Sequence, residues 1–215
     1  MGATVALGTA TVFNGSVDLL LAWPLAGARE LGDRLMAAYA HPERRYHDTR
    51  HLAEVLGRVH ELSAHGAPFD RMAVVLAAWF HDGVYDGRPD AERRSAAWAA
   101  EALPPLVAPE VVAEVVRLVL LTERHRPARG DDNGGALCDA DLAILGAGPD
   151  RYAEYASAVR EEYAEVPDDR FRKGRAAVLR DLLAKPHLFH TAYARDTWEP
   201  AARANVESEL AALAR

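Results

Sequence analysis

An adjacent His-Asp pair at the end of an apolar run is the first place in this sequence where side chains could do chemistry. His81 and Asp82 follow the run Ala77-Ala78-Trp79-Phe80, and another carboxylate, Asp86, stands four residues after Asp82. Neighbouring helical residues point about 100° apart, so both could reach one metal only where the helix ends, and Gly83 supplies that end. An imidazole and a carboxylate would offer nitrogen and oxygen to a divalent cation. Alone, the pair is a weak signal, because a His that closes an apolar helix is more often simply hydrogen-bonded.

Two of the nine histidines, His47 and His51, have a spacing that suits joint ligation. They stand four residues apart, so both project from one face if both are helical. The alternative is that His47 only flanks the helix cap at Asp48 and that His51 alone points inward.

Three further residues extend the candidate set. His125 follows a strongly apolar helix, as His81 does, which favours a place at the edge of the core and at the same end of the bundle. The alternative is a His that the dipole of its own helix stabilises.

Asp139 and Asp141 precede an apolar stretch. One can cap a helix, and the other is costly to bury without a cation or a donor. This favours Asp141 as a ligand and Asp139 as the cap or as support for a ligand.

The elements that must position these side chains are helices. Apolar residues recur at three- and four-residue intervals from Ser16 onward, Pro24 should divide or kink the first helical stretch, and alternating strand patterns are absent. Residues 126–135 are expected to be a polar, Gly-rich loop. The sequence predicts an all-α bundle with sites between facing helices. Asp48 is expected to cap a helix that ends at Ala64, and Asp90 is expected to cap a helix over 92–103. Another helix is expected from Pro68 to the His-Asp pair. The remaining helices are expected to start at Pro109 and near Asp139 and to cover 150–164, 168–184 and 200–214.

Composition limits the class of protein and of partner. The chain has 215 residues, half of them hydrophobic, with a formal net charge of -7 and a pI near 5.7. This fits one domain, over residues 16–215 with an N-terminal arm at 1–15, and gives no general attraction to nucleic acid or anionic lipid. The single cysteine, Cys138, allows no internal disulfide, and no apolar run reaches the ~20 residues of a membrane span. We expect a cytoplasmic protein, monomer or homodimer, that acts on a small molecule.

The assembled residues resemble a known family. His51, His81-Asp82 and Asp141 are similar to the ordered ligand set of the HD-domain superfamily of metal-dependent phosphohydrolases. The flanking segments resemble a bacterial subfamily of predicted HD phosphohydrolases, and the resemblance covers the chain from about Leu21 to its end. The segments that carry it are 45–51, 79–86, 92–96, 122–125, 139–146, 160–163 and 199–205.

The resemblance also implies how many metals bind. Two-metal HD phosphodiesterases and diiron HD oxygenases have two more histidines before the last Asp, whereas this chain offers His125 there. One divalent ion is therefore expected, with Mn, Fe, Co, Ni and Zn all compatible with mixed nitrogen and oxygen ligands. Relatives that hydrolyse alarmone nucleotides carry Glu-Asp shortly after the pair. This chain has Tyr85-Asp86, so Asp86 matches a catalytic acid position and acts alone or with Glu92.

The expected function is hydrolysis of a small phosphate ester or nucleotide. A metal on His51, His81, Asp82 and Asp141 would lower the pKa of a bound water. Asp86 would orient or deprotonate that water. The remaining candidates, His47, His125 and Arg50, would contact the phosphate or protonate the leaving oxygen, and Glu92 would help to bind substrate. Two alternatives remain: an iron-dependent HD-type oxygenase, with Glu92 or His47 as an added ligand, and a non-catalytic HD module that binds a nucleotide.

Overall fold

The centre of the bundle is α3 (Arg71–Phe80), a helix that is buried on all sides. The structure, a computed structural model, describes residues 19–214. Every residue from Ala73 to Phe80 is buried, as expected for an apolar helix enclosed by other helices. The helices packed against α3 are α2 (Thr49–Ala64), α4 (Ala91–Ala102), α5 (Pro109–Leu121) and α6 (Asp132–Leu142).

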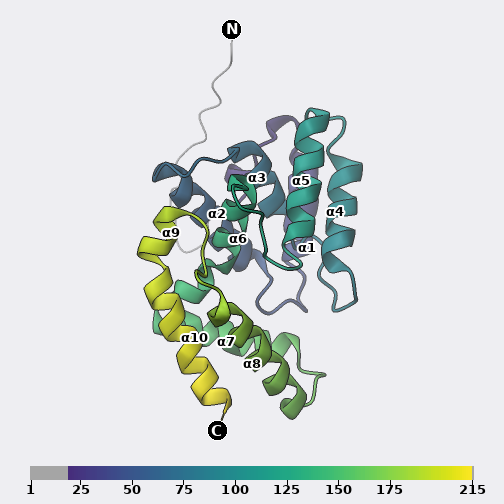
Figure 1. The fold of residues 1–215 in the computed structure, drawn as a ribbon. Helices are drawn as coiled ribbons and strands as arrows, with labels where there is room; N and C mark the ends of the chain where they lie inside the picture. The colour runs from purple at the N-terminus through teal and green to yellow at the C-terminus, as the bar shows by residue number, and fades with distance from the viewer. Residues whose placement is uncertain (1–18, 215) are drawn as a thin grey trace.

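The described residues form one all-α body, as predicted, with a buried His/His/Asp group in its core. In Figure 1, α4 and α5 lie side by side at one edge, while α7, α8 and α10 form the end that holds the C-terminus. The remaining elements are η1 (Leu19–Ala22), η2 (Ala26–Ala28), α1 (Arg29–Tyr39), η3 (Ala143–Gly146), α7 (Pro149–Glu162), α8 (Asp168–Ala184), α9 (Ala192–Thr197) and α10 (Glu199–Leu213).

Several helix boundaries match the sequence predictions. Asp48 caps α2, its side chain accepting hydrogen bonds from two backbone N–H groups, and α2 ends at Ala64. Pro24 lies between η1 and η2 and so divides the first helical stretch. Asp90 occupies the cap position of α4, but its side chain makes no cap hydrogen bond there. The short helix α9 was not predicted, and the predicted N-terminal arm at 1–15 lies outside the described residues.

The predicted start of α3 at Pro68 is wrong. The helix begins at Arg71, because the Asp70 side chain accepts hydrogen bonds from the backbone N–H groups of Met72 and Ala73. Those groups lack a partner within the helix, and a cap of this kind fixes where the helix starts.

The predicted loop at 126–135 is also wrong in its last residues, because α6 starts at Asp132 rather than near Asp139. Gly134 and Gly135 indicated a loop, but they lie inside this helix. A Cβ atom on Gly134 would lie 2.7 Å from Leu121, and one on Gly135 would lie 3.1 Å from His190. These glycines therefore allow Leu121 and His190 to pack close to the backbone of α6.

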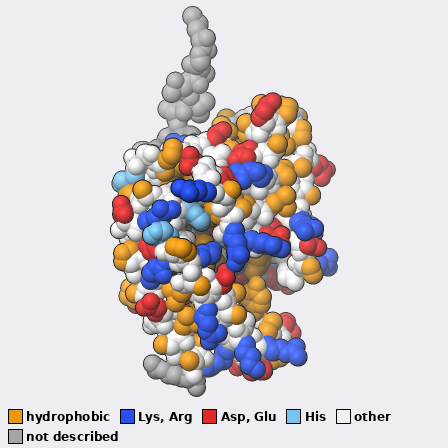
Figure 2. Space-filling view, in the orientation of Figure 1, with side chains coloured by type: hydrophobic (Ala, Val, Ile, Leu, Met, Phe, Trp, Pro, Cys, Tyr) orange, Lys and Arg blue, Asp and Glu red, His pale blue; other side chains and the backbone are white. Residues whose placement is uncertain are grey.

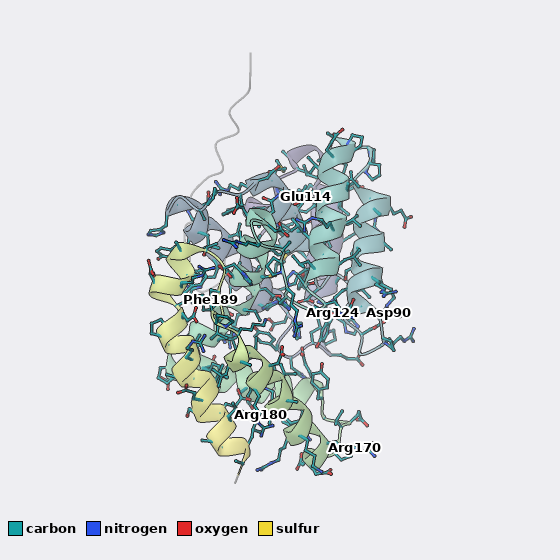
Figure 3. All side chains as sticks on the ribbon, in the orientation of Figure 1. Asp90, Glu114, Arg124, Arg170, Arg180 and Phe189 are labelled. Atoms are coloured by element: carbon teal, nitrogen blue, oxygen red, sulfur yellow. The ribbon has the colours of Figure 1, made fainter. Side chains whose placement is uncertain are left out.

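Two segments that carry candidate residues meet at one end of the α4–α5 pair. Figure 3 labels Asp90, directly before α4, and Arg124, shortly after α5, at that end, with Glu114 further along α5. Because the two helices pack together in opposite directions, the turn that follows His81 and the segment around His125 lie at the same end of the bundle.

The surface is mixed in charge. On the face shown in Figure 2, Lys and Arg side chains stand among Asp, Glu and apolar ones. None of the helices between residues 19 and 214 combines the length and the apolar character that a membrane crossing requires.

Candidate metal centre

Two imidazoles and two carboxylates meet in the core. The Nε2 atoms of His51 and His81 lie 3.1 Å apart. One oxygen of Asp82 lies 3.3 Å and 3.0 Å from these two nitrogens, and one oxygen of Asp141 lies 3.2 Å and 3.7 Å from them. Both histidines are 1% exposed, so this chemistry is enclosed by the fold.

Four of the five separations fit a shared cation, and that between His81 and Asp141, 3.7 Å, is longer. Two ligands about 2.0–2.1 Å from one ion, at angles of 90° to 110°, lie roughly 2.9–3.4 Å apart. The ligand atoms of His51, His81 and Asp141 all lie within 4.8 Å of one another, so these three could hold a metal ion. Asp82 contacts the same two nitrogens, and its role as a fourth ligand stays a prediction.

Helix ends bring these residues together. His51 lies in the first turn of α2, where Asp48 accepts its backbone N–H. His81 is the residue that caps the C-terminus of α3, as the adjacent His-Asp pair requires. Asp141 lies next to the last residue of α6. The site therefore depends on where three helices start or stop, which is set by capping and packing.

The ring of His81 is held in one orientation by the backbone. Its Nδ1 lies 2.7 Å from the carbonyl oxygen of Ala78, so Nδ1–H donates there and Nε2 faces the carboxylates. Metal-binding histidines commonly use such a carbonyl to fix the ring tautomer. The Tyr39 hydroxyl, fully buried in this region, accepts the backbone N–H of Asp82 at 3.2 Å.

The imidazoles and carboxylates of this group shift one another's pKa values. Burial lowers the pKa of His51, but the hydrogen bonds that its ring donates to Asp141 and Asp82 outweigh burial and raise the pKa to about 9. The pKa of His81 is likewise raised, burial being outweighed by Asp82. Burial raises the pKa of both carboxylates, yet His81 holds each well below its usual range. The shifts favour protonated imidazoles beside ionised carboxylates, and a divalent cation bound to the ring nitrogens would displace their protons.

His125 supports the carboxylate of Asp141. Its Nε2 lies 2.7 Å from Asp141 Oδ2, while the other oxygen of Asp141 faces His51. The backbone of His125 is left-handed, with φ of 48°. This conformation is uncommon for a residue with a side chain. The predicted position of His125 at this end of the bundle is confirmed by this contact.

His47 flanks the site without being helical. It precedes the Asp48 cap, so it does not share a helical face with His51. The alternative in which His47 only flanks the cap is therefore the correct one. Its Nδ1 lies 2.7 Å from Glu162 Oε2, and its ring stacks on Tyr85 with centroids 4.1 Å apart. The ring centroid lies 5.4 Å from that of His51.

Sequence reasoning missed a role for Glu162. Its Oε1 accepts the consecutive backbone N–H groups of residues 45, 46 and 47 at 3.1, 2.8 and 2.9 Å. Burial raises the pKa of Glu162, but the hydrogen bond from His47 outweighs it and lowers the pKa to about 2. Glu162 thereby fastens the end of α7 to the segment that carries His47.

Arg44 was missed as well. It is 8% exposed, and its guanidinium donates to the carbonyl oxygens of His47 at 2.9 Å, Asp82 at 2.7 Å and Gly83 at 3.1 Å. It therefore joins the segment before α2 to the turn after α3. A buried arginine bound to backbone carbonyls has no signal in the sequence, where it resembles any surface arginine.

Three predicted residues are not brought to the cluster. Asp86 binds both terminal nitrogens of Arg94 at 2.8 and 2.6 Å, a contact that holds its pKa far below the usual value. Arg50 is an exposed partner of Glu154 at 2.9 Å. Glu92 lies in the first turn of α4. A carboxylate bound in this way to an arginine is a poor proton acceptor, which argues against Asp86 as the general base.

Asp139 does not cap its own helix, so the first of its two predicted roles, that of a helix cap, is wrong. It lies inside α6, is fully buried, and accepts hydrogen bonds from the backbone N–H groups of His190 and Thr191 and from the Thr191 hydroxyl. Burial raises the pKa of Asp139 to about 6. This contact joins the helix of Asp141 to the start of α9.

The chain matches no family model, no curated protein and no solved structure. Membership of the HD superfamily therefore stays a prediction that rests on the order of the residues and on their meeting in the core.

Proposed function

We propose that this protein is an HD-type, metal-dependent phosphohydrolase that acts on a small phosphate ester or nucleotide. The observation that carries the proposal is the meeting of His51, His81 and Asp141 on one point of the core, with Asp82 beside them. Their order along the chain is the HD order, and the atoms that face one another are those a divalent ion would bind.

The proposed reaction converts a phosphate monoester and water into an alcohol and inorganic phosphate. The water oxygen bonds to phosphorus, the ester P–O bond breaks, and one proton from water ends on the leaving oxygen. A divalent ion held by His51, His81, Asp141 and Asp82 would lower the pKa of the attacking water and neutralise charge on the phosphoryl oxygens.

Residues around this group have distinct parts in the proposal. His125 acts as a positioning residue, because its Nε2 holds one oxygen of Asp141 and leaves the other for the centre. Glu162 binds Nδ1 of His47 and leaves Nε2 of that ring available to protonate the leaving oxygen. Asp86 has no part in the step, because Arg94 occupies its carboxylate.

The test is a screen of the purified protein, loaded with Mn²⁺, Co²⁺ or Ni²⁺, against nucleotides and phosphomonoesters. We expect release of inorganic phosphate, with a loss on the order of a hundredfold or more in Asp82→Ala. Asp33→Ala, which removes an exposed carboxylate on α1, is the matched control and should keep wild-type activity. Absence of phosphate release with every metal, together with oxygen consumption by the iron-loaded protein, would replace the proposal with the oxygenase alternative.

A further inference from the structure

His51, His81, Asp82 and Asp141 are called the metal group below. A cavity of about 360 Å³ lies directly against this group. His51 and Asp141 form part of its wall, together with Tyr46 and residues of α2, η3 and α7. A larger cavity of about 520 Å³ is lined instead by residues such as His65, Arg129 and Tyr193 and includes no member of the metal group. The smaller cavity is thus the one from which a bound molecule contacts both an imidazole and a carboxylate of the centre.

Tyr46 lines this cavity and a neighbouring one of about 480 Å³, and its hydroxyl lacks a partner among the described residues. Tyr46 is 5% exposed, and its buried hydroxyl makes no hydrogen bond within residues 19–214. A tyrosine hydroxyl can donate one hydrogen bond and accept others. A buried polar group without a partner destabilises the folded protein. An oxygen atom of a bound molecule would satisfy it.

Arg151 places a positive charge over the ring of Tyr46. Its guanidinium carbon lies 6.0 Å from the centroid of the Tyr46 ring, and Nε and Nη2 bind the two oxygens of Glu54 at 2.7 and 2.9 Å. Its third nitrogen, Nη1, lies 3.7 Å from Glu154, too far for a hydrogen bond. Arg151 therefore keeps N–H groups for a ligand, and a hydroxyl with a guanidinium suits phosphoryl oxygens.

The end of the cavity away from the metal group is lined by side chains of opposite charge that bind each other. His51, Glu54, Arg58 and Glu61 recur at three- and four-residue spacing along α2 and line the cavity from the metal group outward. Ten residues of helix span about 15 Å. Arg58 and Glu61 bind each other at 2.6 Å, and their side chains remain 36% and 27% exposed. The Tyr193 hydroxyl donates to the other Glu61 oxygen at 2.7 Å, so ligand hydroxyls would use the remaining lone pairs of Glu61 and the other N–H groups of Arg58.

We propose that this cavity binds a phosphate monoester of a polyhydroxylated molecule, such as a sugar phosphate. Tyr46 and Arg151 hold the phosphoryl group against the metal group, and Arg58 and Glu61 hydrogen-bond the hydroxyls of the body. The proposal rests on the hydrolase function and names its class of substrate.

The test uses the full-length, Mn²⁺-loaded protein with ribose 5-phosphate, phenyl phosphate and inorganic phosphate as probes. We expect lower KM for ribose 5-phosphate than for phenyl phosphate. Tyr46→Phe and Arg151→Gln should each raise the KM for ribose 5-phosphate, and the calorimetric Kd for inorganic phosphate, at least about tenfold at unchanged metal content. Tyr46→Phe removes only an unpaired hydroxyl, so its thermal stability should not fall.

Two variants control for local damage. Tyr155→Phe removes a hydroxyl that binds Arg175, on a ring 4.7 Å from that of Tyr46. Arg160→Gln changes another arginine of α7, which binds Asp168 and the carbonyls of residues 163 and 166. Both should keep wild-type KM values.

The outcomes separate this proposal from the hydrolase function. Hydrolysis of ribose 5-phosphate with an unchanged KM in Tyr46→Phe and Arg151→Gln would overturn the cavity assignment alone. A lower KM for phenyl phosphate would overturn the hydroxyl-rich class of substrate. Binding of ribose 5-phosphate that depends on Tyr46, without hydrolysis of any ester, would overturn the hydrolase function and support the cavity as a ligand site.

Discussion

Protons would compete with a bound metal ion for the ring nitrogens of His51 and His81. The pKa of His51 is raised to about 9 and that of His81 is also raised, so protonation of these rings is favoured when no metal is bound. A metal must displace these protons, so its apparent affinity should rise with pH, at least about tenfold per unit between about pH 6 and pH 8. Titration calorimetry in buffers of different ionisation enthalpy would count the released protons. An affinity that does not change with pH would contradict the assignment.

The catalytic role of Asp86 can be tested, because the sequence and the structure indicate different roles for this residue. The motif position indicates a catalytic acid, whereas the structure binds its carboxylate to Arg94 at the surface. We expect Asp86→Asn to keep kcat within about threefold of wild type, because the carboxylate does not reach the centre. Steady-state kinetics would measure it, with Asp141→Asn as the damaging comparison. A loss in Asp86→Asn as large as that in Asp141→Asn would restore Asp86 to the mechanism.

The sequence predicted the residues of the buried His/His/Asp group better than the residues around them. His51, His81 and Asp141 were predicted because their side-chain types and order carry a chemical pattern. Arg44 and Glu162 could not be predicted, because their partners are backbone groups far along the chain: Arg44 binds the carbonyl of Asp82, 38 residues away, and Glu162 binds the N–H of His47, 115 residues away. Only the fold brings such groups together.

The same limit applies to helices. Caps with a clear side-chain signal, such as Asp48 before α2, gave correct boundaries. The start of α6 was missed because glycine, which favours loops, is required there by the close approach of Leu121 and His190. Tertiary packing overrides local preference at this point. Asp139 then lies inside α6, where it holds the start of α9.

Arg44 couples the segment before α2 to the turn after α3, and this coupling can be measured. Arg44→Met keeps the length of the side chain but leaves three carbonyl oxygens without their donor. We expect a loss of about 3 kcal/mol in the free energy of unfolding. Arg45→Met, at an exposed neighbouring position, should stay within about 0.5 kcal/mol of wild type. Urea unfolding would compare them, and equal stability of the two variants would refute the coupling.

The metal should stabilise the molecule as a whole, because its ligands come from α2, α6 and the end of α3. A ligand at a hundredfold excess over its Kd stabilises the folded state by about 2.7 kcal/mol, which raises the Tm of a chain of this size by about 5–10 °C. His81→Ala should lose this shift, and His41→Ala, which changes an exposed histidine, should keep it. Calorimetric scans with and without Mn²⁺ would measure it. An equal shift in both variants would place the metal elsewhere.

A cobalt titration followed by visible absorption examines the centre itself, because the Co²⁺ spectrum reports the number and type of ligands. The structure predicts saturation at one Co²⁺ per chain with a spectrum of mixed nitrogen and oxygen ligation. Asp141→Ala and His81→Ala should each abolish the tight site, while Asp33→Ala should leave it unchanged. A wild-type chain that binds no Co²⁺, or an Asp141→Ala chain that still binds one with the same spectrum, would contradict the metal centre on which the proposed hydrolysis depends.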